Sequence, residues 1–293
     1  MTVAVGYLAG KGGRSPLYLA VEAARTLKTS LTVVTVVPRP WITPSLARVD
    51  AEYAQYAEQL AADSAKEAQQ CLDSIGDGID VAFHKVAHRS VSAGLQEAVD
   101  ELKAEALVLG SAADGKLGQV IVGSTTDRLL HSSPVPLAIS PRGYRGSKAG
   151  GLTRITCAYP GTPECIDAVE RVAALAQRLS VPMRVITFAV RGRTMYPPEV
   201  GLRAEDSILE AWAEQSRKAL AELKAKHVVS DDTVLEVTTG YAWDEAIDAA
   251  DWQDGELLAL GTKPTGGIAR VFLGSRGSKI VRHSPVPVLV LPG

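Results

Sequence analysis

Two glycine–serine pairs, Gly123-Ser124 and Gly274-Ser275, stand where the sequence predicts that a helix begins. A helix N-terminus presents free N–H groups and a partial positive charge, so it attracts phosphate. Glycine lets an anion approach the backbone, and the serine hydroxyl either caps the helix or donates to the phosphate. These residue types indicate an anion site in each copy. For one copy alone, plain N-caps and loop glycines would be the favoured interpretation.

The pairs belong to a motif that the chain carries twice, over residues 107–139 and 257–291. Equivalent positions, such as Gly110 and Gly261, are 151 residues apart. Each copy contains an apolar strand ending in glycine, a loop of small residues, an amphipathic helix and a Ser-Pro-Val-Pro strand. A repeat of this length indicates tandem domains and is too long for a solenoid unit. The candidate binding residues are Gly110, Ser111, Gly123, Ser124 and Thr125 in the first copy and Gly261, Thr262, Gly274, Ser275 and Arg276 in the second. For Arg276, phosphate contact and a solvent-facing position are equally favoured.

Strands and helices must alternate to place these loops. Alternation of this kind predicts a parallel sheet covered by helices on both faces, because right-handed crossovers need intervening helices. We therefore expect two five-stranded parallel α/β domains, over 1–142 and 152–293, joined by a glycine-rich linker at 143–151. The predicted strands are 2–8, 31–37, 79–87, 106–110, 134–139, 154–159, 184–190, 234–239, 256–261 and 285–291, and the predicted helices are 15–28, 45–75, 92–103, 123–132, 164–179, 203–226, 243–252 and one from 275.

Bulk composition limits the classes of function. The chain has 293 residues, of which 46% are hydrophobic, and a formal net charge of −2, which fits two globular domains without a basic surface for nucleic acid. Three cysteines without CxxC spacing argue against a zinc site and for a cytoplasmic location. The N-terminus lacks the pattern of a signal peptide, and no apolar run is long enough for a membrane span.

With these motifs in place, the chain resembles a tandem universal stress protein over nearly its whole length. That family has a five-stranded, adenine nucleotide alpha hydrolase-like α/β domain with the pattern G-x2-G-x9-G-S/T before its last helix. Gly110, Gly123 and Ser124 match the pattern in the first half. The resemblance implies a regulatory role in the stress response and binding of ATP, AMP or a cyclic nucleotide. The two halves should pair intramolecularly through their last strands, over 134–139 and 285–291, because these strands are apolar and lie at sheet edges that need covering. The resemblance agrees with this expectation, since single-domain members of the family pair in this way as homodimers.

Both halves depart from the family's pattern in the same places. Ala113 and Pro264 stand where the second glycine belongs, and Pro264 also removes an N–H donor. The family's first strand ends with an aspartate that holds the adenosine; here Ala9 or Leu8 takes that place, depending on the alignment, and Pro160 takes it in the second half. These changes support the alternative of a nucleotide-independent structural or protein-interaction module. The first half keeps more of the pattern, so we expect it to be the binding half if only one binds.

An enzyme is the third hypothesis. Residues 110–117 nearly match a P-loop, but Leu117 stands where Mg²⁺ needs Ser or Thr, and there is no G-x-S-x-G elbow. We name no catalytic or metal-ligating residue and leave slow ATP hydrolysis open. A homodimer and an unidentified protein partner also stay open. We interpret Trp243 and Trp252 as packing anchors, Tyr56 as a buried anchor of the helix over 45–75, and Cys157 as a core residue.

Overall fold

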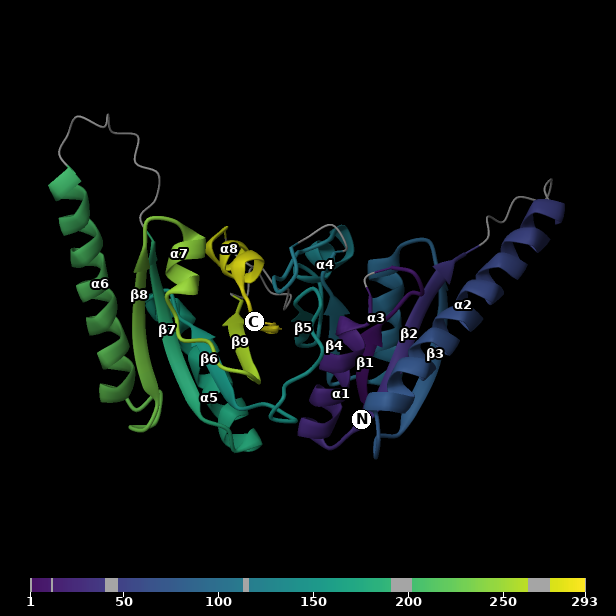
Figure 1. The fold of residues 1–293 in the computed structure, drawn as a ribbon, viewed down its shortest axis with the longest axis horizontal. Helices are drawn as coiled ribbons and strands as arrows, with labels where there is room; N and C mark the ends of the chain where they lie inside the picture. Colours follow the sequence, from purple (N-terminus) through teal and green to yellow (C-terminus); the bar gives the residue numbers. More distant parts are fainter. Residues whose placement is uncertain are drawn as a thin grey trace.

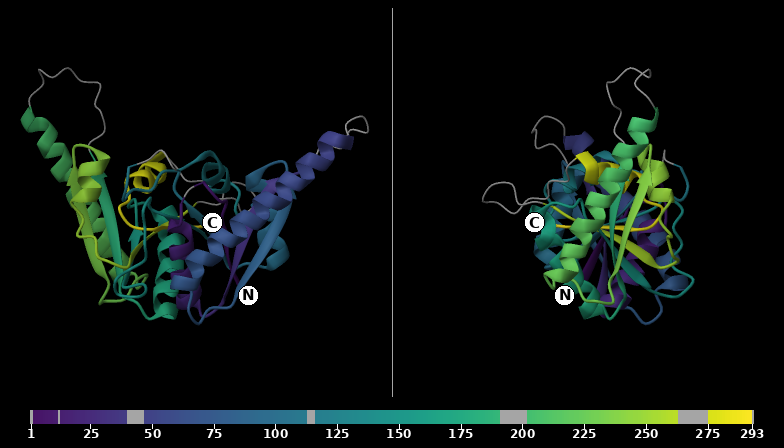
Figure 2. Two further views of the ribbon diagram at one scale, coloured as in Figure 1. Left: turned by 45° about the vertical axis from the view of Figure 1, so that its right-hand side comes forward. Right: turned by 90° about the vertical axis from the view of Figure 1, so that its left-hand side faces the viewer.

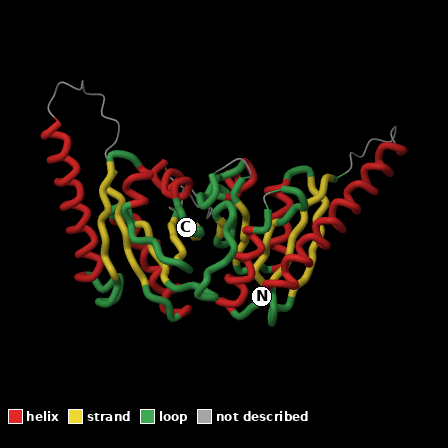
Figure 3. The backbone as a smooth tube through the Cα atoms, viewed as in Figure 1, coloured by secondary structure: helices red, strands yellow, loops and turns green. Residues whose placement is uncertain are grey.

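Strands and helices alternate along the chain as the sequence predicts (Figures 1 and 3). The computed structural model describes residues 2–11, 13–39, 47–112, 116–190, 202–262 and 275–292. The first half contains β1 (Thr2–Gly6), α1 (Ser15–Leu27), β2 (Ser30–Pro38), α2 (Ala47–Ile75), β3 (Val81–His88), α3 (Val91–Leu102), β4 (Ala106–Gly110), α4 (Ser124–Leu129) and β5 (Leu137–Ser140). The second contains β6 (Arg154–Ala158), η1 (Pro163–Cys165), α5 (Ile166–Leu179), β7 (Met183–Val190), α6 (Leu202–Ala225), β8 (Val234–Gly240), α7 (Trp243–Asp248), β9 (Glu256–Gly261), α8 (Ser275–His283) and β10 (Val288–Leu291).

The ten strands that the structure describes form one continuous sheet, in the order β3-β2-β1-β4-β5-β10-β9-β6-β7-β8. Neighbouring strands are parallel within each half. At the junction β5 and β10 pair antiparallel, with Ala138 opposite Leu289. In Figures 1 and 2, α2 and α6 lie at opposite ends of the molecule with this junction between them. The prediction that the halves pack through their last strands is confirmed.

Helices cover both faces of the sheet, and two hydrophobic cores lie between them and the strands. Successive side chains of a strand point to opposite faces, so Val3 and Val5 join the core under α1, α2, α5 and α6, while Ala4 joins the core under α3, α4, α7 and α8. Cys157 is fully buried in the first of these cores, as predicted, and burial raises the pKa of its thiol to about 12. None of the described helices is long and apolar enough to cross a membrane.

Helices α1 and α5 end in the same way, which gives a common reference for comparing the two halves. Lys28 follows α1 and Ser180 follows α5, both in the left-handed region, with φ of 52° and 54°. The N–H group of each residue returns to a carbonyl of the last turn, which satisfies part of the helix end. Positions on the two helices can therefore be matched by counting back from these residues.

The linker is held by one carboxylate from each half. Glu22 on α1 accepts hydrogen bonds from the Tyr144 hydroxyl and from the backbone N–H of Ser147. Asp254, just before β9, accepts from the backbone N–H of Lys148 at 2.8 Å and from the Ser147 hydroxyl at 3.0 Å. Burial and the bond to Glu22 raise the pKa of Tyr144 above its usual value. The connection is therefore tied to the end of the sheet where β4 and β9 begin.

A buried ion network lies where β6, β7 and β9 begin. Arg184 is 1% exposed, and its Nη2 donates to Oε1 of Glu256, whose side chain is fully buried, at 2.7 Å. The other Glu256 oxygen accepts from Arg154 at 2.7 Å, and Arg184 also donates to Glu236 at 2.7 Å. The Thr156 hydroxyl donates to Glu256 and accepts from Arg184 Nε. In the first half Thr32 takes the place of Arg184, and its hydroxyl lies 3.0 Å from that of Thr2.

Helix ends and one anchor differ from the predictions. The helix predicted over 243–252 ends at Asp248, because the Trp252 indole N–H turns back and donates to the carbonyl of Ile247 at 2.7 Å. The helix predicted over 123–132 ends at Leu129, where the chain continues in tighter i→i−3 turns. Trp243 and Trp252 are packing anchors, as predicted, since both contact the core under α7. The prediction that Tyr56 is a buried anchor is wrong, because it is 57% exposed on α2.

Candidate functional site

The first half has a cavity at the carboxyl ends of β1 and β4. The strand order reverses direction between these strands, and open α/β sheets bind ligands at such a switch point. The cavity has a volume of about 190 Å³. Gly110 and Thr125, two of the predicted residues, line it together with Tyr7, Lys11 and Leu109. The repeated motif therefore lines a cavity in this half, and Lys11 also lines it.

The second half has a larger cavity at the equivalent place, the carboxyl ends of β6 and β9. Its volume is about 330 Å³. Two predicted residues, Gly261 and Arg276, line it. Four aromatic residues, Tyr159, Phe188, Trp212 and Trp243, contribute to its walls. This cavity combines an exposed guanidinium with aromatic surface, which suits a ligand that has both an anionic group and a flat ring.

Gly261 lies at this cavity because helix α5 crosses β9 closely. A Cβ atom added to Gly261 would lie 2.0 Å from the Cβ of Ala168. No side chain can occupy that space without moving the helix. The glycine at the end of the strand is therefore required by packing, whatever the cavity binds.

The hydroxyls of Ser111 and Thr262 are directed into the fold. Ser111 Oγ donates to the carbonyl of Ser140 at 2.7 Å and accepts from the N–H of Ile121 at 3.1 Å. Thr262 Oγ1 donates to the carbonyl of Leu291 at 3.1 Å. Both side chains are buried and join the end of β4 or β9 to the last strand of the same half. Their side chains act in the fold and do not line either cavity.

The glycine–serine pair of the first half begins a short helix. Gly123 is the N-cap of α4, in extended backbone, and its carbonyl accepts from the N–H of Asp127 at 2.8 Å. Ser124 is therefore the first helical residue, exposed, and its hydroxyl does not cap the helix. Ser275 is likewise the exposed first residue of α8. Outside the described residues lie Gly274, Ala113 and Pro264.

A tyrosine follows the first strand of each half and was missed by sequence reasoning. Tyr7 lines the first cavity and Tyr159 the second, and the carbonyl of each accepts from a threonine hydroxyl, that of Thr35 or Thr187. Burial raises the pKa of both phenols, and a hydrogen bond to Glu67 raises that of Tyr7 further. Both hydroxyls therefore stay protonated at neutral pH. Their position directly after a strand was the available signal.

Comparison with known proteins agrees with this architecture. Two stretches of the chain, residues 2–141 and 151–292, match the universal stress protein family. The chain belongs to the universal stress protein family. It is 64% identical, over all 293 residues of both chains, to a universal stress protein of Mycobacterium tuberculosis. A solved universal stress protein shares the fold of this chain. A crystal structure from Archaeoglobus fulgidus aligns over 99% of this chain and 97% of its own, with a TM-score of 0.59 at 15% identity. One from Pseudomonas aeruginosa aligns over 99% and 93%, with a TM-score of 0.57 at 14% identity.

Proposed function

We propose that this universal stress protein is a cytoplasmic regulatory protein that binds an adenine nucleotide in the cavity of its second half. The observation that carries the proposal is the joint presence of Arg276, Trp212 and Trp243 around one hollow at a switch point. Its volume of about 330 Å³ lies within the range of roughly 300–1,000 Å³ typical of ligand sites. The first cavity, at about 190 Å³, is below that range. The cavity sizes thus favour the half opposite to the one that the sequence motif favours.

The chemistry of the second cavity fits the two ends of a nucleotide. Arg276 lies in the first turn of α8, where its guanidinium and the free N–H groups of the helix both favour phosphate. The Lys279 ammonium lies 5.8 Å from the ring centre of Trp243, so a second cation stands beside the aromatic wall. Aromatic faces stack on bases with about 1–3 kcal/mol per base. The three cysteines are unpaired, which supports a reducing compartment.

Titration of ATP, AMP and cyclic AMP, followed by calorimetry and by tryptophan fluorescence, tests this proposal. Two of the chain's four tryptophans line the cavity, so a bound base should quench the emission as the heat saturates. We expect one nucleotide per chain with a Kd between micromolar and low millimolar. Arg276→Gln should weaken binding about tenfold, corresponding to about 1.4 kcal/mol. Arg282→Gln, an exposed position in the last turn of the same helix, is the matched control. Saturable heat with none of the three nucleotides would contradict the proposal.

A nucleotide-independent interaction module is the second candidate, and features of the first half favour it there. In the first cavity Lys11 lies among apolar side chains, those of Leu8, Val34 and Leu109. The N–H of Ala9, at one of the two positions that align with the family's aspartate, is already bound to the Ser64 hydroxyl at 3.0 Å.

The variant Gly123→Val separates the two halves. The valine side chain blocks the approach of a phosphate to Gly123-Ser124, which belongs to the first half alone. The variant should therefore leave the ATP titration unchanged if only the second half binds. Loss of binding in this variant would instead assign the nucleotide to the first half.

A further inference from the structure

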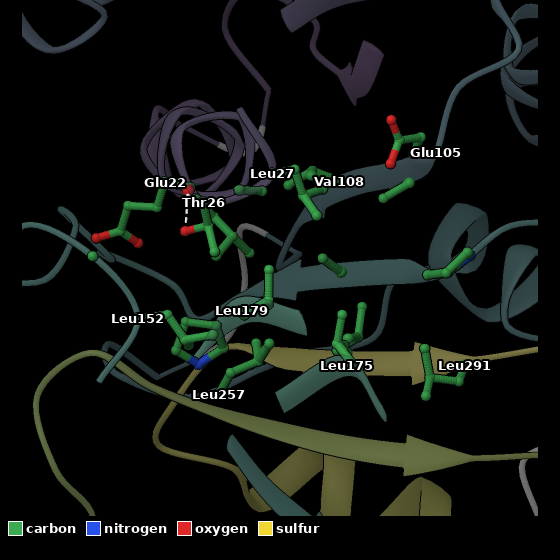
Figure 4. A pocket seen from close by; sticks show the side chains of 18 of the residues that line it. Glu22, Thr26, Leu27, Glu105, Val108, Leu152, Leu175, Leu179, Leu257 and Leu291 are labelled. Atoms are coloured by element: carbon green, nitrogen blue, oxygen red, sulfur yellow. Dashed lines mark hydrogen bonds between the residues drawn. The ribbon is translucent and has the colours of Figure 1, made fainter. Parts of the chain in front are cut away.

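The largest of the three cavities described here lies at the junction of the two halves, away from both sheet-end cavities. Its volume is about 450 Å³. Strands β4, β5, β10 and β9 form its floor, and helices α1 and α5 form its walls (Figure 4). It therefore lies on the pseudo-twofold axis that relates the halves, where Ala138 and Leu289 face each other. None of the candidate binding residues that the structure describes lines it.

At two equivalent pairs of positions the first half contributes a small side chain and the second a large one, which leaves space on the side of α1. Ala23 on α1 and Leu175 on α5 both line it, and each lies five residues before the left-handed residue that ends its helix. Ala138 and Leu289 form a second unequal pair. Figure 4 shows leucine side chains, among them Leu179 and Leu257, directed into the hollow. The lining is mainly aliphatic, so water gains few hydrogen bonds there and an alkyl chain is a favourable occupant.

Charges at the edge of the cavity select the head group of that occupant. Two arginines on the α5 wall, Arg171 and Arg178, line the cavity seven residues apart on the same helix face. Arg178 is exposed, and its guanidinium donates no hydrogen bond to any residue that the structure describes. Arg171 donates to the carbonyls of Pro292 and Asp167, which leaves some of its five N–H donors free.

The acidic residues around the cavity are mostly engaged elsewhere. The Glu22 carboxylate accepts from the linker, and Glu256 accepts from Arg154 and from the buried Arg184. Glu105 is the remaining acid, and in Figure 4 it lies at the end of the cavity far from Leu179. The α5 wall of the cavity therefore carries the positive charge, from Arg171 and Arg178, and the α1 wall carries the carboxylate of Glu22.

We propose that this junction cavity binds a medium-chain alkyl carboxylate, with the chain between α1 and α5 and the carboxylate at Arg178. A water molecule takes roughly 30 Å³ in the liquid, and a methylene group is of similar size. About 450 Å³ therefore accommodates roughly fifteen heavy atoms, which is enough for a chain such as decanoate. This site shares no lining residue with the proposed nucleotide cavity.

Calorimetric titration of the full-length protein with sodium octanoate, decanoate and dodecanoate, each below its aggregation concentration, tests the proposal. Affinity should rise about fourfold per added methylene until the cavity is full. Decanoate should bind more tightly than decanol or decylamine. Arg178→Gln should weaken decanoate up to about fivefold, as expected for an exposed charge, and leave decanol unchanged. No saturable binding of any alkanoate, or decylamine binding as tightly as decanoate, would overturn the proposal.

Variants whose larger side chains fill the cavity test whether decanoate binds there. Ala23→Leu copies Leu175 of the other wall and should weaken decanoate more than tenfold; Thr26→Leu is a second filling variant on the same helix. Ala62→Leu, at an exposed position on α2, is the matched control. Circular dichroism and thermal unfolding establish that each variant folds, and the ATP titration should stay as in the wild type, which separates this proposal from the nucleotide site. Decanoate binding unchanged in both filling variants would overturn it.

Discussion

The sharpest stability prediction concerns Glu256, the acid at the centre of the buried ion network. Its two carboxylate oxygens accept from Arg184, Arg154, the Thr156 hydroxyl and the backbone N–H of Gln253. The substitution Glu256→Gln keeps the shape of the side chain but removes its charge. It also replaces one acceptor oxygen with an NH₂ group that faces donors. Arg154 and Arg184 then keep their positive charges but lose the carboxylate that both of them bind.

The expected loss follows from the burial of the partners. Arg184 is 1% exposed and its side chain is packed under the ring of Trp252, with 5.0 Å from guanidinium to ring centre. Removing one member of a buried ion pair typically costs 3–5 kcal/mol, because the remaining charge is left in a poorly solvated place. Glu236, which also binds Arg184, is partly exposed and compensates in part. We therefore expect Glu256→Gln to lower the free energy of unfolding by about 3 kcal/mol, a large share of the 5–15 kcal/mol typical of a native protein.

Urea unfolding followed by circular dichroism measures this loss. Two controls bracket it. Glu214→Gln breaks an exposed pair with Arg217 and should change stability by no more than about 0.5 kcal/mol. Thr32→Val removes the hydroxyl pair at the corresponding place of the first half and should cost about 1 kcal/mol. A loss for Glu256→Gln below about 1 kcal/mol would refute the argument that burial makes this network fragile.

Three other predictions concern packing and titration. Gly261→Ala should destabilise the protein by more than about 3 kcal/mol, because its Cβ atom would overlap that of Ala168 on a packed helix; thermal unfolding measures the loss, and an unchanged melting temperature would contradict the close approach. Cys157 should resist alkylation by iodoacetamide at pH 8 in the native protein and react only after unfolding, since burial raises its pKa to about 12; mass spectrometry after labelling would reveal early modification if this is wrong. Tyr144 is stable as a neutral phenol bound to Glu22 and its pKa is raised, so its contribution is intact below about pH 10 and is lost as pH rises above that value. Between pH 10 and 12 the unfolding free energy of Tyr144→Phe should fall less steeply than that of the wild type, by up to about 1.4 kcal/mol per pH unit, and parallel curves would exclude this role.

Much of the fold could be predicted because local and repeated signals agree. The β-branched run of β2 predicts a strand buried on both faces, and Ser30–Pro38 is buried along most of its length. The apolar Ser-Pro-Val-Pro strands predicted the junction, since an apolar edge strand needs a partner. Their first residues are turns instead of strand, because proline gives no N–H to the ladder, and the serine hydroxyl bonds locally: Ser133 to the carbonyl of Val135, and Ser284 to that of Val286.

The candidate sites could be predicted only in part. Gly110, Thr125, Gly261 and Arg276 lie at the cavities because a motif at a strand end maps directly onto the edge of a parallel sheet. The inward direction of the Ser111 hydroxyl depends on which strand lies beside β4, and the sequence does not state that. The ion network and the junction cavity join residues from distant strands and helices. They become visible only when strand order and the pairing of the two halves are known.

The antiparallel pairing of β5 and β10 has a consequence for how such a chain can evolve. In a homodimer of single-domain proteins, the residue on the twofold axis meets its own copy, so the interface must be complementary to itself. Here the axis passes between Ala138 and Leu289, which are different residues at equivalent positions. Two alanines would enlarge the junction cavity and two leucines would narrow it. Joining the halves in one chain releases the centre of the interface from this symmetry, and it lets each side specialise while the pairing stays independent of protein concentration.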